Sequence, residues 1–100
     1  MIKVEIKKEN KQYRKISLFG HALYADHGKD IVCSACSSIV ITTVNACLAL
    51  DKNSLSYMTD EIGMIITVNN NDHVTQTLIQ NMVSLLEELG ESYPDNIKVK

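Results

Sequence analysis

The sequence predicts an α/β fold of the α+β type: a single small domain over residues 1–100, with strands and two main helices in the order ββαββαβ. Three observations predict it. Alternating apolar residues mark short strands, a long stretch without charge marks one helix, and an amphipathic stripe marks the other. A chain of 100 residues with only one Pro has room for one modest core. We expect the helices on one or both faces of a small mixed sheet.

The first half of the chain predicts a hairpin followed by a helix. Apolar and charged residues alternate over residues 2–6, and apolar positions alternate again over 13–19, so two strands are expected to pair across 9–11. Residues 31–50 carry no charge, but their Ser, Thr and Asn residues make them a poor membrane span. We interpret this stretch as a buried helix, covered by the sheet on one side and by a helix or subunit on another.

The second half predicts two strands, a helix and a last strand. The strands are expected at 55–58 and 63–68, with a turn between them. Gly90 suits the C-terminal cap of the following helix, and 97–99 suits a short strand. The helix is expected to bury one stripe of apolar residues: Val74, Leu78, Met82, Leu85, Leu86 and Leu89.

Composition limits the classes of function. The net charge is −2, and the lysines cluster near the N-terminus, so no broad basic surface favours direct nucleic-acid binding. The first residues alternate and do not resemble a signal peptide. An odd number of cysteines, three, without such a signal indicates reduced thiols and a cytoplasmic location. We expect no membrane association.

Two residues twelve positions apart, His21 and Cys33, are the candidates for catalysis. Asp30 is a good N-cap, which makes Cys33 the third residue of the helix. Unpaired N–H groups and the positive end of the helix dipole lie there and stabilise a thiolate. Gly20 and Gly28 bound the loop that carries His21, so the imidazole and the thiol can be brought together as base and nucleophile.

Other chemistries use the same residues. From the spacing alone, Cys33 is also consistent with a small buried side chain. With Cys36 it forms a C-x-x-C motif at a helix start, the position of a thiol–disulfide redox motif, although the element order differs from that of thioredoxin. Together with His21 and His27 the two cysteines also offer a Cys2His2 ligand set for zinc, although the spacing is not that of a zinc finger.

A longer motif is more specific than any of these pairs. Gly20-His21-Ala22, followed by Gly28-x-Asp30-Ile31-Val32-Cys33-x-Ala35-x-Ser37, resembles the signature of the ribosomal-processing cysteine proteases, the Prp family. The resemblance extends through Val44-Asn45-Ala46 to Tyr93-Pro94 and covers essentially the whole chain. Cys36 is a departure, because a small or branched apolar residue is expected there.

The resemblance implies a function. Members of the family remove a short N-terminal extension, with bulky apolar residues near the scissile bond, from the large-subunit ribosomal protein number twenty-seven. The family's nucleophile and general base correspond to Cys33 and His21. The resemblance also implies a homodimer that uses neither a cofactor nor a metal.

Further residues are candidates for supporting roles. Backbone N–H groups near Val32 and Ser34 are expected to form the oxyanion hole. Asp30 is expected to cap the helix rather than to orient His21. Ser37, one turn beyond Cys33, could hydrogen-bond within the site or to its own helix. The loop is a candidate for gripping the substrate and closing over it, and its candidate residues are Gly20, Leu23, Tyr24 and Gly28.

Overall fold

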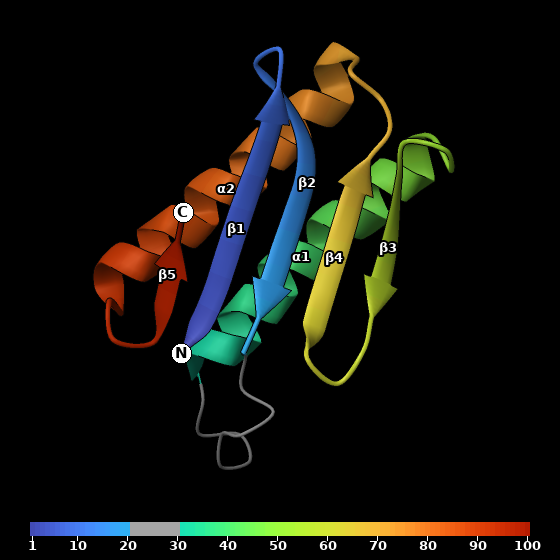
Figure 1. Cartoon of the computed structure of the whole chain (residues 1–100). Helices are drawn as coiled ribbons and strands as arrows, with labels where there is room; N and C mark the ends of the chain where they lie inside the picture. Colours follow the sequence, from blue (N-terminus) through green and yellow to red (C-terminus); the bar gives the residue numbers. More distant parts are fainter. Residues whose placement is uncertain (21–30) are drawn as a thin grey trace.

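A computed structural model of the chain, which describes residues 1–20 and 31–100, contains a mixed sheet of five strands with two helices behind it (Figure 1). The element order is the predicted ββαββαβ. The elements are β1 (Ile2–Glu9), β2 (Gln12–Phe19), α1 (Ile31–Leu50), β3 (Leu55–Thr59), β4 (Gly63–Val68), α2 (His73–Ser92) and β5 (Ile97–Val99).

The strand order across the sheet is β3-β4-β2-β1-β5. β1 and β2 form the predicted hairpin, and their turn residues Asn10 and Lys11 both have positive φ, at 51° and 66°. Positive φ at both central residues matches the right-handed twist of the flanking strands. β5 pairs parallel to β1, whereas all other neighbours are antiparallel, so the sheet is mixed as expected. The central β2–β4 pairing joins segments that α1 separates in the sequence.

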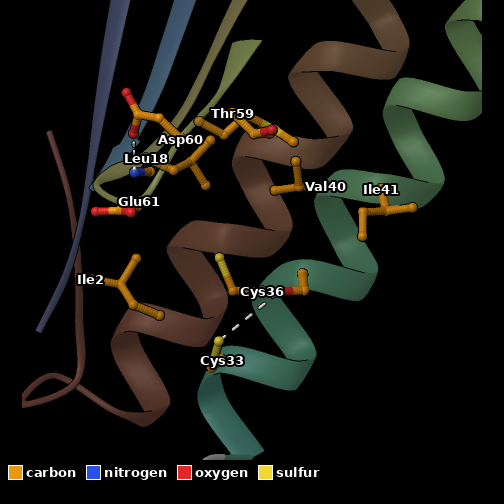
Figure 2. A pocket seen from close by; sticks show the side chains of 12 residues that line it. Ile2, Leu18, Cys33, Cys36, Val40, Ile41, Thr59, Asp60 and Glu61 are labelled. Atoms are coloured by element: carbon orange, nitrogen blue, oxygen red, sulfur yellow. Dashed lines mark hydrogen bonds between the residues drawn. The ribbon is translucent and has the colours of Figure 1, made fainter. Parts of the chain in front are cut away.

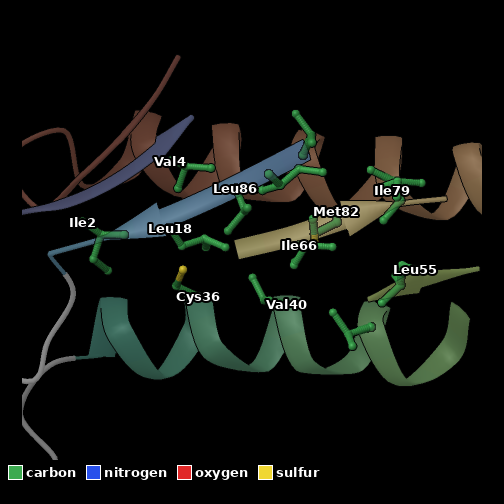
Figure 3. Close-up of a cluster of buried hydrophobic side chains, with 14 of the residues drawn as sticks. Ile2, Val4, Leu18, Cys36, Val40, Leu55, Ile66, Ile79, Met82 and Leu86 are labelled. Carbon is green, nitrogen blue, oxygen red and sulfur yellow. The ribbon is translucent and has the colours of Figure 1, made fainter. Parts of the chain in front are cut away.

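The core lies between one face of the sheet and the two helices (Figure 3). Alternate strand residues point to this face, because successive side chains of a strand point to opposite sides. α1 and α2 pack against each other, and α2 also contacts β5 and β2. The largest fully buried side chains come from the sheet and from α2: Ile16, Ile66, Ile79, Met82, Leu86 and Ile97.

α1 packs by one side only. Its buried residues recur at helical spacing: Val32, Cys36, Val40, Thr43, Val44 and Cys47. The opposite side is exposed and uncharged, and its residues are Ile31, Ser34, Ser38, Thr42, Asn45 and Ala49. By length and composition α1 is long enough to cross a membrane, and its inner side forms part of the core. The predicted helix is confirmed, and so is its expected cover, because both the sheet and the partner helix α2 pack against it.

The apolar stripe of α2 is centred differently from the prediction. Ile79, Met82 and Leu86 are buried and form the middle of the inner face of α2. Val74 and Leu85, which belong to the predicted stripe, are 51% and 38% exposed. Apolar residues cover more of this helix than the core can bury. Spacing alone therefore does not fix which line of residues faces inward.

The prediction that Gly90 caps α2 is wrong. The helix continues to Ser92, and its cap is Tyr93, whose backbone N–H donates to the Leu89 carbonyl at 2.9 Å. A Cβ at position 90 would lie 3.4 Å from the Ile97 carbonyl oxygen. Gly90 lies where β5 passes close to the helix.

Candidate active site

Cys33 is the third residue of α1, as the sequence predicts, and its side chain is partly exposed. The first N–H groups of a helix have no carbonyl acceptor within the helix, and the positive end of the helix dipole lies there. No acidic residue occupies this first turn. The backbone at this position therefore favours an anion, such as a thiolate or an oxyanion.

Ser37 lies one turn further along α1. Its Oγ is 3.9 Å from the Sγ of Cys33, and either atom can be the donor. The sequence names Ser37 as a residue able to hydrogen-bond within the site, and the structure brings its hydroxyl beside the thiol. Val32 is buried and Ser34 is exposed on the same turn as Cys33.

A cavity of about 580 Å³ opens beside Cys33, between the first half of α1 and the end of the sheet (Figure 2). α1 contributes Cys33, Cys36, Ser37 and Val40 among others. Ile41 of α1 and the strand residues Ile2, Leu18 and Met64 add apolar wall. The β3–β4 connection adds Thr59, Asp60, Glu61 and Gly63. A largely apolar cavity next to a thiol can hold an apolar side chain while its backbone passes the sulfur.

The β3–β4 turn is held by its own hydrogen bonds. The Asp60 carboxylate accepts from the backbone N–H groups of Ile62 and Gly63, at 2.8 and 3.0 Å. The backbone N–H of Asp60 donates to the Gly63 carbonyl at 2.9 Å. A Cβ on Gly63 would overlap the carbonyl oxygen of Leu18, so only glycine lets β4 begin so close to β2. This close pairing sets the position of one wall of the cavity.

The three cysteines occupy different surroundings. Cys33 is partly exposed and Cys36 is 5% exposed, and both line the cavity. Cys47 is 1% exposed and lies further along α1. Burial raises the pKa of the Cys47 thiol, with a smaller contribution from the Asp72 carboxylate.

Several residues named from the sequence lie outside the described residues: His21, Leu23, Tyr24, Gly28 and Asp30. The pairing of the imidazole with the thiol, the cap at the start of α1 and the closure of the loop are therefore still predictions. His27, a ligand in the zinc alternative, also lies outside. Within 1–20 and 31–100, no three His, Cys, Asp or Glu residues cluster as metal ligands do.

Gly20 is the one loop candidate that the structure describes. Its φ is 69°, and a Cβ there would lie 2.8 Å from the Met1 carbonyl oxygen. Its backbone N–H donates to the Ile62 carbonyl at 3.2 Å. Glycine is required here by the local backbone, whatever its part in binding.

Sequence reasoning did not find the walls of the cavity. Ile2, Leu18 and Met64 come from three strands, and the strand order of the sheet brings them to α1. Their apolar character already marks them as core residues, so no separate signal distinguishes a cavity wall from a packed interior.

Comparison with known proteins identifies the group to which this site belongs. Residues 1–98 match the family model described as cysteine protease Prp. Three curated relatives carry the name ribosomal processing cysteine protease Prp. The protein of Staphylococcus aureus (strain Mu50 / ATCC 700699) is 31% identical over 83 residues, which cover 80% of this chain and 78% of the relative. That of Bacillus subtilis (strain 168) is 28% identical over 107 residues, covering 99% and 96%.

A solved structure supports the same grouping. The crystal structure of the essential ribosomal processing protease Prp from S. aureus, in complex with a covalently linked product peptide, superimposes with a TM-score of 0.91. Its sequence is 27% identical, and the match covers 100% of this chain and 98% of that one. The predicted family and fold are both confirmed.

Proposed function

Because the chain belongs to the cysteine protease Prp family, we propose that it removes the N-terminal extension of the large-subunit ribosomal protein number twenty-seven, with Cys33 as the nucleophile. The observation that carries this proposal is the position of Cys33 in the first turn of α1, with its side chain on an apolar cavity. The backbone there stabilises a thiolate, and the cavity offers room for part of a peptide.

The proposed mechanism pairs Cys33 with His21. The imidazole takes the thiol proton, and the thiolate attacks the carbonyl carbon of the scissile peptide bond. N–H groups of the first turn of α1, near Val32 and Ser34, donate to the oxyanion that forms. Protonated His21 gives its proton to the leaving amine, and water then hydrolyses the thioester. The role of His21 rests on the family signature, because the residue lies outside the described part of the chain.

The cavity supports a substrate with bulky apolar residues near the cleaved bond. Leu18, Val40 and Met64 offer such a residue an apolar wall close to the thiol. Burying one large apolar side chain contributes about 1.5–3 kcal/mol, enough to position a short extended peptide. The S. aureus relative has been crystallised with a covalently linked product peptide, which supports peptide chemistry for this site.

The proposal also covers the state of the protein in the cell. We infer a cytoplasmic homodimer that needs no cofactor and binds neither nucleic acid nor membrane. The exposed, uncharged side of α1 supports a second copy as partner. The thiol-redox and zinc-binding alternatives use Cys33 for other chemistry, and the family match favours the protease over both.

The test is cleavage of a synthetic peptide that spans the extension and its junction with the mature ribosomal protein. We expect the parent protein to cut once at the junction, and Cys33→Ala and His21→Ala to lose turnover. Ser34→Ala is the matched control, because it changes an exposed side chain beside Cys33 and keeps the backbone N–H. Circular dichroism establishes that each variant is folded. Undiminished cleavage by Cys33→Ala would contradict the mechanism, and no cleavage by the parent would contradict the substrate.

A further inference from the structure

Two thiols, those of Cys33 and Cys36, line one cavity. Figure 2 shows both sulfur atoms on the side of α1 that faces the cavity. Their exposure differs: Cys33 is partly exposed, whereas Cys36 is 5% exposed. A reagent that enters the cavity from solvent therefore reacts first with Cys33. The buried Cys36 thiol is placed to react with Cys33 rather than with the reagent.

The helix places the two cysteines at a separation that a disulfide can span. Residues three apart in an α-helix have Cα atoms about 5 Å apart, inside the range of about 4.4–6.8 Å found in disulfides. Their Cβ atoms are about 5–6 Å apart in a regular helix, and a disulfide needs about 3.5–4.5 Å. Closing the disulfide therefore requires the two Cβ atoms to approach each other by about 1–2 Å. Cys33 lies in the first turn of α1, where the N–H groups have no acceptors within the helix.

We propose that Cys33 and Cys36 form a modification site for low-molecular-weight disulfides, in which a reversible Cys33–Cys36 disulfide replaces the nucleophilic thiol. In the first step the Cys33 thiolate attacks one sulfur of glutathione disulfide. A mixed disulfide forms, and one glutathione thiolate leaves. In the second step Cys36 loses its proton and its thiolate attacks the Cys33 sulfur, which releases the second glutathione. Two protein thiols are oxidised by two electrons, and one glutathione disulfide is reduced to two glutathione thiols.

The burial of Cys36 suits the second step. Attack on the mixed disulfide is intramolecular, so Cys36 needs reach to Cys33 rather than contact with solvent. Cys47 cannot replace Cys36, because fourteen residues of helix separate it from Cys33 by about 21 Å.

The consequence for activity rests on the proposed function, because a sulfur held in a disulfide cannot attack a peptide carbonyl. The exchange reaction itself does not depend on it. We therefore expect reversible loss of peptidase activity, in proportion to the fraction of protein that carries the disulfide. The intact mass reports the exchange whether or not a peptide is cleaved, so failure of the two proposals can be told apart.

The experiment treats the full chain with glutathione disulfide and follows its intact mass. We expect the parent to lose the mass of two hydrogen atoms, peptide mapping to join Cys33 to Cys36, and dithiothreitol to restore the original mass. Cys36→Val should instead retain a glutathione adduct on Cys33. Cys47→Val is the matched control, in the same helix, and should behave as the parent does.

Activity is measured on the same samples, each relative to its own reduced form. A parent protein that stops at the glutathione adduct, as Cys36→Val does, would overturn the proposal, and so would a parent that remains unmodified. If the disulfide forms but no sample cleaves the peptide, even in its reduced form, the modification site is upheld and only the proposed function is contradicted.

Discussion

Cys33 and Cys36 show how the surroundings of a side chain decide its chemistry. Both are cysteines of α1 on the same cavity, yet one is partly exposed at the first turn and the other is almost fully buried. The backbone groups at the helix start favour an anion at position 33. Position 36 forms part of the core cluster, where a thiol behaves as a small apolar side chain until a neighbouring sulfur is oxidised.

Met64 tests whether the cavity binds the substrate. It is a partly buried residue of β4 on the cavity wall. Met64→Ala removes most of this apolar side chain from the wall beside the proposed peptide path. We expect kcat/KM for the extension peptide to fall about tenfold, because losing apolar contact in a specificity pocket has this order of effect. Steady-state kinetics on the two proteins measure it.

Met58 supplies the matched control. It has the same side chain on the neighbouring strand β3, is 74% exposed and is not among the residues that line the cavity. Met58→Ala should leave kcat/KM unchanged. Equal values of kcat/KM for Met64→Ala and Met58→Ala, with both variants folded, would show that the cavity does not bind the substrate.

The sequence predicts the reactive residue of the site but not its surroundings. The position of Cys33 in the first turn follows from a local signal, a residue type favoured at N-caps before an apolar run. Ser37 follows from helical spacing, and its hydroxyl does lie beside the thiol. Ile2, Leu18 and Met64 become neighbours only through strand pairing across the sheet, which no short-range pattern encodes.

At the scale of elements, the strands and α1 could be predicted closely from the sequence and the details of α2 could not. Alternation and the absence of charge are properties of a segment by itself, so β4, β5 and α1 have the expected ends. The inner face of α2 depends on what packs against it. Gly90 likewise lies where β5 passes beside α2, not at the end of the helix, and this neighbour comes from a later part of the chain.

The N-cap of α2 makes stability depend on pH. The Asp72 carboxylate accepts from the backbone N–H and the hydroxyl of Thr75, at 3.0 and 2.9 Å, and these hydrogen bonds lower its pKa below the ordinary 3.8. A lowered folded-state pKa stabilises the fold above the unfolded-state value and ceases to do so as pH falls through the folded-state value. We therefore expect the denaturant midpoint to fall between about pH 5 and pH 2.

The Asp72→Asn variant tests the effect of the carboxylate charge separately from the effect of the N-cap hydrogen bonds. Asparagine is also a good N-cap, so the variant should retain most of the stability at pH 7 and show a shallower fall in acid. Some fall should remain, because hydrogen bonds from Asn53 and Asn70 lower the pKa of Asp51 in the same direction. An acid transition with the same slope in both proteins would rule out Asp72 as a contributor.

Replacing each of two glycines, Gly63 and Gly90, with alanine should have opposite effects on stability. Gly63→Ala forces a Cβ onto the Leu18 carbonyl oxygen, which must separate β2 from β4. We expect the free energy of unfolding to fall by about 3 kcal/mol or more, the upper range for overpacking. Gly90→Ala adds its Cβ at an ordinary 3.4 Å inside α2, and alanine is the better helix former by about 1 kcal/mol.

Urea denaturation of both variants measures this contrast. Gly90→Ala should be as stable as the parent or more stable, while Gly63→Ala unfolds at a lower concentration. Equal destabilisation by the two changes would mean that β2 and β4 do not approach each other as closely as described.

At the scale of the molecule, the distribution of charge is uneven. The chain has 22% charged residues, and none of them lies in the 20 residues of α1. The exposed side of α1 is therefore a surface without charge, about 30 Å long by helix geometry. Depletion of charge is characteristic of the centre of protein interfaces. Among residues 1–20 and 31–100, sheet and helix packing leaves this side of α1 exposed.

A second copy of the chain is the partner that we predict for this surface. A stable interface needs about 800 Å² from each partner, and α1 can supply its centre. We expect a dimer at micromolar concentration by sedimentation equilibrium. Asn45→Lys places a charge from each subunit in the uncharged surface that we predict to be the interface, so this variant should sediment as a monomer. Glu88→Lys, an equally exposed change on α2, should remain a dimer. A monomeric parent would refute the dimer, and a dimeric Asn45→Lys would move the interface away from α1.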